Sequence, residues 1–150
     1  MADRSYIPEN DAARERLRVL VSRLSDEEMG RPLGDGWTVA AGLCHLAFWD
    51  RLWLGKFEEW DRAGAVPMPT PWPAPIDADR INGAMLPWWL TVSFDRVRQE
   101  AVAAAEAVDR RVATVSDAVV EQILAARSRT IIRAVHRREH LDQIERALGR

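Results

Sequence analysis

Apolar residues recur every three or four positions along most of this chain, which is the spacing of helices with one buried face. The first such stretch predicts a helix over residues 10–29, in which Leu17, Val21 and Leu24 share a face. Glycines and a proline crowd residues 30–36, and this composition predicts a turn that ends the helix.

A second, more aromatic helix is expected over residues 39–63. Thr38 is a favourable N-cap, because its hydroxyl can accept a hydrogen bond from an N–H group of the first turn. Trp37 precedes the cap and can pack back on that turn. Tryptophan and phenylalanine recur through this helix at helical spacing, so we expect it to be the central one.

Residues 66–76 carry five prolines at every second position. Proline fixes φ and removes an N–H donor, so this segment is predicted to be an extended, polyproline-like crossover. We interpret it as a stiff spacer between helices. The alternative is that Trp72, carried on the segment, forms part of a lid over a pocket.

Beyond the crossover, a short helix is expected over residues 77–86, broken or redirected at Pro87. Ser93 is a good N-cap for a third long helix that reaches about residue 112. Residues 116–148 are helical by propensity, and a break near Ser128 is left open.

No segment alternates between apolar and polar residues with a period of two, so no strand is expected. The helical segments instead predict an all-α protein with a single domain over residues 1–150. Its architecture would be a four-helix bundle with a long Pro-rich crossover between the second and third helices.

Composition narrows the partners and the compartment. A formal net charge of -2 over 150 residues provides no positive field for phosphate backbones, so nucleic acid is not an expected partner. No apolar run approaches the roughly 18 residues that span a bilayer, and the first residues do not resemble a secretion signal. We therefore expect a cytoplasmic protein that does not bind membranes.

The three histidines of the chain are the candidate chemistry. His136 and His140 are four residues apart on the last helix, so both rings lie on one face and can reach one metal ion at about 2.0–2.1 Å. His45 lies in the most apolar helix, where an unpaired imidazole would cost about 1–3 kcal/mol. A shared metal ion would satisfy all three rings. The alternative is a set of core histidines bonded to carbonyls or carboxylates.

Three nitrogen ligands leave coordination positions open, as in catalytic rather than structural metal sites. Imidazole ligands favour zinc, nickel, cobalt, iron or copper over magnesium or calcium, and we expect zinc, nickel or iron. Residues 136–140 also match the HxxEH pattern of inverted zinc peptidases. Those enzymes need a further acidic ligand well downstream, whereas only ten residues follow His140, so we reject that interpretation.

Several residues near the histidines are pocket candidates. Trp49 shares a face with His45, and the neighbouring tryptophans could wall a cavity or simply pack in the core; these are Trp53, Trp88 and Trp89. Glu139 could shuttle protons or pair with a nearby arginine on the surface. Arg133 and Arg137 could hold a carboxylate of a substrate, or could be surface arginines paired with glutamates. Cys44 points away from His45 around the helix and is expected to be a small core residue.

Three segments together resemble the DinB/YfiT-like superfamily, which includes the mycothiol-dependent maleylpyruvate isomerase N-terminal domains. They are residues 36–39 (Gly-Trp-Thr-Val) leading into residues 45–47 (His-Leu-Ala), the Pro-containing crossover, and the terminal HxxxHxxQ of residues 136–143. The resemblance implies a four-helix bundle, often dimeric, with a divalent metal held by His45, His136 and His140. Gln143 matches the glutamine that recurs in the family, with a structural role or one that supports the ligands.

Members of this superfamily include thiol S-transferases, an isomerase and detoxifying hydrolases. We therefore expect a metal-dependent enzyme acting on small molecules, with a mycothiol- or bacillithiol-type thiol as a candidate cofactor. The ion would lower the pKa of a bound thiol or water. A non-catalytic metal-containing protein that binds small molecules or serves in a stress response is the alternative, and a helical bundle without metal is a third. A homodimer is the expected assembly.

Overall fold

The computed structural model describes residues 1–67, 75–126 and 129–150, and these residues form seven helices and one two-stranded hairpin. The helices are α1 (Tyr6–Arg23), α2 (Asp26–Met29), α3 (Val39–Ala63), α4 (Pro75–Trp89), α5 (Phe94–Thr114), α6 (Asp117–Ala125) and α7 (Arg133–Ala147). The strands are β1 (Pro32–Gly34) and β2 (Trp37–Thr38). The predicted all-α fold class is confirmed.

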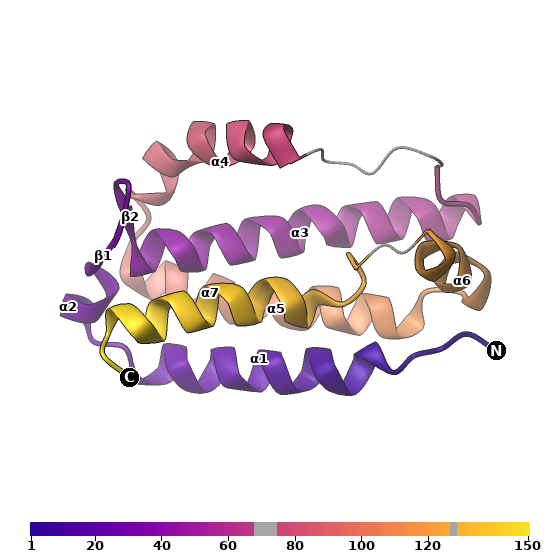
Figure 1. Cartoon of the computed structure of the whole chain (residues 1–150), viewed down its shortest axis with the longest axis horizontal. Helices are drawn as coiled ribbons and strands as arrows, with labels where there is room; N and C mark the ends of the chain where they lie inside the picture. Colours follow the sequence, from indigo (N-terminus) through magenta and orange to yellow (C-terminus); the bar gives the residue numbers. More distant parts are fainter. Residues whose placement is uncertain (68–74, 127–128) are drawn as a thin grey trace.

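The four long helices α1, α3, α5 and α7 lie side by side (Figure 1). Helix α5 packs against α3 and α1, and α7 packs against the same two helices. Figure 1 also shows that α1 and α7 run in one direction and α3 and α5 in the other. Because α3 and α5 are parallel, the chain between them must return along the length of the molecule. Helix α4 lies in this crossover and packs on α3.

The core consists of two buried apolar clusters with a polar layer between them. One cluster includes Leu17, Leu43 and Leu141, and the other includes Phe57 and Ile131. Between them along the four long helices lie buried polar side chains, namely Asn10, Asp50, Asp109 and Arg137. This layer matters for function because His136 lies next to it on α7.

The first predicted helix is in fact two helices. The backbone of Leu24 is extended, with ψ of 123°. Ser25 then starts α2 with a capping box, in which its hydroxyl accepts from the Glu28 N–H and the Glu28 carboxylate accepts from the Ser25 N–H. The prediction of one helix over residues 10–29 is therefore wrong, because a local cap outweighs the continuing apolar period.

A small hairpin stands where only a turn was expected. Strand β1 pairs antiparallel with β2, and the prediction that the chain contains no strand is wrong here. The tip turns through three consecutive residues with positive φ, at Gly34 (101°), Asp35 (50°) and Gly36 (81°). Glycine adopts this region without steric cost, which is why two of the three positions are glycine.

Helix α4 is longer than predicted at both ends. It starts at Pro75, where the missing N–H is harmless, and it continues through Pro87 to Trp89. Pro87 lies in the last turn, so it removes few helical hydrogen bonds. Residues 68–74 of the Pro-rich segment, including Trp72, lie outside the described residues.

The last predicted helix divides into α6 and α7, near the break left open at Ser128, itself outside the described residues. The residue before α7, Ile132, provides no side-chain cap. Asn10 of α1 takes that role: its Oδ1 accepts from the Ala134 N–H at 2.9 Å, and its Nδ2 donates to the Ile131 carbonyl at 3.0 Å. The helix with two histidines is thereby anchored to α1.

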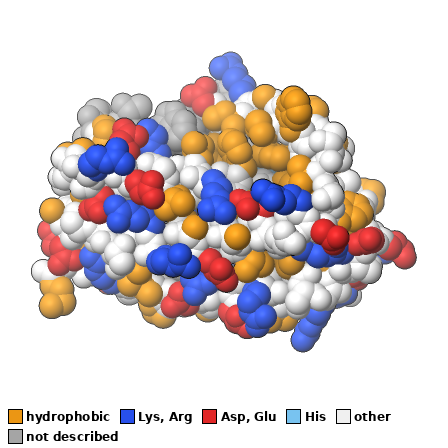
Figure 2. Space-filling view, turned by 180° about the vertical axis from the view of Figure 1, so that it is seen from behind, with side chains coloured by type: hydrophobic (Ala, Val, Ile, Leu, Met, Phe, Trp, Pro, Cys, Tyr) orange, Lys and Arg blue, Asp and Glu red, His pale blue; other side chains and the backbone are white. Residues whose placement is uncertain are grey.

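Charged side chains of both signs are interspersed on the face shown in Figure 2, and apolar side chains gather around a hollow there. A groove between α3, the end of α4 and the start of α5 is lined by apolar residues that include Phe48, Trp89 and Val92. Trp88 is 71% exposed. Exposed apolar area of this kind is typical of contact surfaces.

Within the described ranges, no helix combines the length and apolar character needed to cross a bilayer.

We predict that Asn10→Ala lowers the free energy of unfolding by about 2 kcal/mol, because two buried backbone groups lose their partner. Urea denaturation followed by circular dichroism measures this loss. Ser22→Ala, an exposed position on the same helix, serves as the control and should change stability by less than about 0.5 kcal/mol. Equal effects of the two substitutions would contradict the anchoring role of Asn10.

Candidate metal centre

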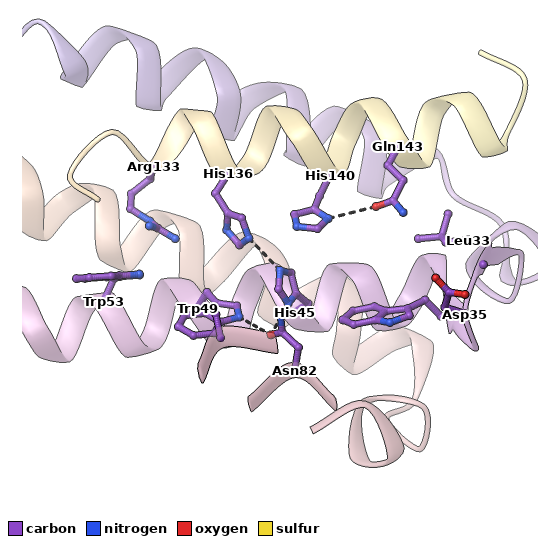
Figure 3. A pocket seen from close by; sticks show the side chains of 13 residues that line it. Leu33, Asp35, His45, Trp49, Trp53, Asn82, Arg133, His136, His140 and Gln143 are labelled. Atoms are coloured by element: carbon purple, nitrogen blue, oxygen red, sulfur yellow. Dashed lines mark hydrogen bonds between the residues drawn. The ribbon is translucent and has the colours of Figure 1, made fainter. Parts of the chain in front are cut away.

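Three imidazoles converge where α3 faces α7 (Figure 3). His45 comes from α3, and His136 and His140 come from successive turns of α7. The nitrogen atoms that they could offer to an ion all lie within 4.8 Å of one another. His45 Nε2 and His136 Nε2 are 2.9 Å apart. The three histidines singled out from the sequence are thus positioned to bind one metal ion.

The separations between these nitrogens suit a transition-metal ion. Metal–nitrogen bonds of about 2.0–2.1 Å in a tetrahedral site place two ligand nitrogens about 3.3 Å apart. The 2.9 Å separation and the 4.8 Å limit lie on either side of that value. Small rotations of the rings would therefore bring all three nitrogens to bonding distance.

Hydrogen bonds determine which nitrogen of His45 faces the site. Trp49 Nε1 donates to Asn82 Oδ1 at 2.8 Å, because an indole N–H is only a donor. His45 Nδ1 lies 3.1 Å from the same oxygen. That oxygen is an acceptor, so Nδ1 of His45 carries the proton and donates it. The Nε2 lone pair is left for an ion, as in most metal-bound histidines.

His140 repeats this arrangement within α7. Its Nδ1 lies 3.3 Å from Oε1 of Gln143, one turn further along the helix. Donation from Nδ1 to this carbonyl oxygen again leaves Nε2 as the free ligand atom. Gln143 is therefore placed to orient the ring of His140.

Burial keeps the three rings uncharged at neutral pH. Burial removes water from the ring of His45 and is the main cause that lowers its pKa to about 3, and the electrostatic effect of His140 adds to it. Loss of solvent and then the positive charge of Arg133 lower the pKa of His136, and burial also lowers that of His140. Neutral imidazole is the form that binds metals, so the rings are in their ligand form at neutral pH.

The histidines line a pocket of about 450 Å³ between α7, α3, α4 and the hairpin. Much of its apolar wall is aromatic, with Trp37 from the hairpin and Trp49 and Trp53 from α3. Arg133 lies at one end of the pocket and Asp35 at the other (Figure 3). A largely aromatic wall beside three potential metal ligands suits a small organic molecule that carries a metal-binding group.

Some of the other residues that the sequence analysis proposed for the pocket line it, and others lie elsewhere. Gln143 and Arg133 line the pocket, as do Trp49 and Trp53. Glu139 is exposed on α7 and lines a neighbouring surface hollow with His140 and Gln143, but it is not part of the pocket wall. Trp88 is largely exposed and Trp89 is buried beside the ring of His45, and neither belongs to the pocket lining.

Arg137 does not face the pocket, which corrects the expectation that it could hold a substrate. Its side chain is 0% exposed. Its Nη2 donates to Asp50 at 3.1 Å and to Asp109 at 2.8 Å, and its Nη1 donates to Asp109 at 2.8 Å. Because Arg137 directly follows His136, it points about 100° away around the helix and into the core.

Sequence reasoning missed Asn82 and the hairpin residues Leu33 and Asp35, all of which line the pocket. Asn82 lies within a helix without an unusual pattern, and its role depends on how α4 packs on α3. The turn at residues 30–36 was predicted, but nothing in its sequence indicated that its tip reaches the pocket of the histidines.

We predict that Asn82→Ala weakens binding of Zn²⁺ about 10- to 100-fold without abolishing it, because His45 loses the partner that orients its ring. Competition with a chromophoric chelator measures the affinity. Asp79→Ala, at an exposed position of the same helix, is the control and should bind as the unmodified protein does. Unchanged affinity in Asn82→Ala would contradict the orienting role.

Comparison with known proteins agrees with the resemblance drawn from the sequence. The model of the DinB superfamily matches residues 9–144, a range that includes all three histidines, Asn82 and Gln143. No curated protein matches the chain, and no solved structure does. The match extends over most of the chain, and the protein belongs to the DinB superfamily.

Proposed function

We propose that this protein is a divalent-metal-dependent enzyme that acts on small molecules, with thiol S-transfer as its leading activity and hydrolysis or isomerisation as related possibilities. The observation that carries the proposal is the convergence of three uncharged imidazoles on the wall of a pocket of about 450 Å³. Membership of the DinB superfamily supports it. The proposed ion is zinc, nickel or iron, which nitrogen ligands favour.

A bound divalent ion would lower the pKa of a thiol or water at its open coordination position. The residues of the chain would hold and shape the site. His45 and His140 present Nε2 while Asn82 and Gln143 fix their rings. Three neutral ligands leave the ion with its full charge, which favours an anion beside it.

The aromatic wall would exclude water from the reacting atoms. Trp37 packs edge-on against His45, with ring centroids 5.5 Å apart, and Trp49 lies 6.4 Å from the same ring. A drier site strengthens the interaction between an ion and an anionic sulfur.

The cytoplasmic location and the homodimer stay predictions. The apolar groove beside Phe48 and Trp89 supports the homodimer.

We predict that untagged protein binds one Zn²⁺ per chain and that His136→Ala lowers the affinity at least about 100-fold, because one of three ligands is lost. Isothermal titration calorimetry gives both values. Cys44→Ser is the matched control, since this partly buried thiol adjoins His45 in sequence and burial raises its pKa to about 11. Equal stoichiometry and affinity in His136→Ala and the unmodified protein would overturn the metal site.

We predict that the metal-loaded protein accelerates the reaction of mycothiol or bacillithiol with monochlorobimane at least about tenfold over the uncatalysed rate. The thiol sulfur forms a bond to carbon, chloride leaves and the thiol proton passes to solvent. Fluorescence of the product measures the rate, and His136→Ala is expected to remove the acceleration. Turnover of ester or amide substrates with water alone would favour a hydrolase, and no turnover across a broad panel would favour a binding protein.

A further inference from the structure

Arg133, the first residue of α7, is buried and has one donor nitrogen without a partner. Its side chain is only 5% exposed. Its Nε donates to Asp50 Oδ1 at 2.8 Å, and its Nη1 donates to the carbonyl of Thr130 at 3.3 Å. Its Nη2 is buried and has no hydrogen-bond partner among the described residues. A buried donor on a charged group is costly to leave unpaired, so we expect a hydrogen-bond acceptor to bind this nitrogen.

The unpaired nitrogen belongs to a residue of the pocket wall. Arg133 lines the same pocket as the three histidines and precedes His136 by three residues, on the same side of α7. Figure 3 shows its guanidinium at the end of the pocket beyond His136. The positive charge is close enough to contribute to the lowered pKa of both His136 and His45.

Asp50 is the carboxylate that pairs with Arg133, and it leaves Nη2 without a partner within the described part of the chain, whereas Arg137 is paired by Asp109 as well. Asp50, the carboxylate bound to Arg133, also accepts two hydrogen bonds from Arg137. Among the described residues that line the pocket, the one carboxylate is that of Asp35, at the opposite end. The three histidines add no negative charge. An anionic group that entered the pocket would therefore meet a guanidinium with a free donor.

We propose that Arg133 determines specificity, by pairing its Nη2 with a carboxylate of the small molecule that reacts at the three histidines. The inference rests on the proposed function and adds the substrate class, a small molecule with a carboxylate beside its reacting group. Arg133 acts on the position of the ligand and takes no part in bond making.

The test compares two probes of nearly equal size, 3-mercaptopropionate and its neutral amide, 3-mercaptopropanamide. Both are titrated into protein loaded with Co²⁺, whose absorption reports a bound sulfur. The carboxylate probe is expected to bind at least about tenfold more tightly, as a charge-assisted hydrogen bond predicts. In Arg133→Gln the two affinities should become equal. Arg138→Gln, the same substitution at an exposed position of α7, is the control and should keep the preference.

Each outcome decides between the interpretations. Equal affinities for the two probes in the unmodified protein, or an unchanged preference in Arg133→Gln, would overturn the role of Arg133 while the metal site stands. Protein that binds no metal would overturn the proposed function and this inference together. Circular dichroism and Co²⁺ stoichiometry show whether Arg133→Gln is folded. If it is not, the comparison of probes in the unmodified protein and in Arg133→Lys, which should keep part of the preference, decides the question.

Discussion

The buried guanidinium of Arg137 is the contact on which the arrangement of the helices depends. It lies between the two apolar clusters and donates to Asp50 of α3, to Asp109 of α5 and to the backbone carbonyl of Asn10 in α1. One side chain of α7 is thereby bonded to each of the other three long helices. Buried charges are tolerated only when they are fully paired, and removing one partner typically costs about 3–5 kcal/mol. The three helices can therefore shift little relative to α7.

The same contact sets the register of the candidate metal centre. Arg137 directly follows His136 and precedes His140 by three residues, so its position against Asp50 determines where both rings meet α3. Asp50 follows His45 by five residues, a rise of about 7.5 Å along α3. The histidines are thus brought together by an ion pair in the core and by the cap that Asn10 provides. A site supported in this way would be preorganised for an ion.

Local periodic features were predictable from the sequence, whereas contacts between distant segments were not. The bounds of α3 were predicted because Thr38 caps its start and the apolar period continues to Gly64, which ends it with φ of 65°. The spacing of His136 and His140 likewise placed both rings on one face. The separation of α2 from α1 had a local signal in the capping box at Ser25, but the apolar period concealed it. Asn82 had none, because its importance follows from the packing of α4 on α3.

Arg133 and Arg137 show most clearly where sequence reasoning ends. They are one turn apart on the same arginine-rich helix, and the sequence offers both the same two interpretations. The structure separates them, because Arg137 uses its donors within the core while Arg133 keeps one nitrogen at the pocket. Both share the carboxylate of Asp50. An anion bound to Arg133 would weaken the ion pair between Arg133 and Asp50, and the ion pair between Asp50 and Arg137 would become stronger. Under the proposed role of Arg133, ligand binding in the pocket and the stability of the helical core would be linked through this one carboxylate.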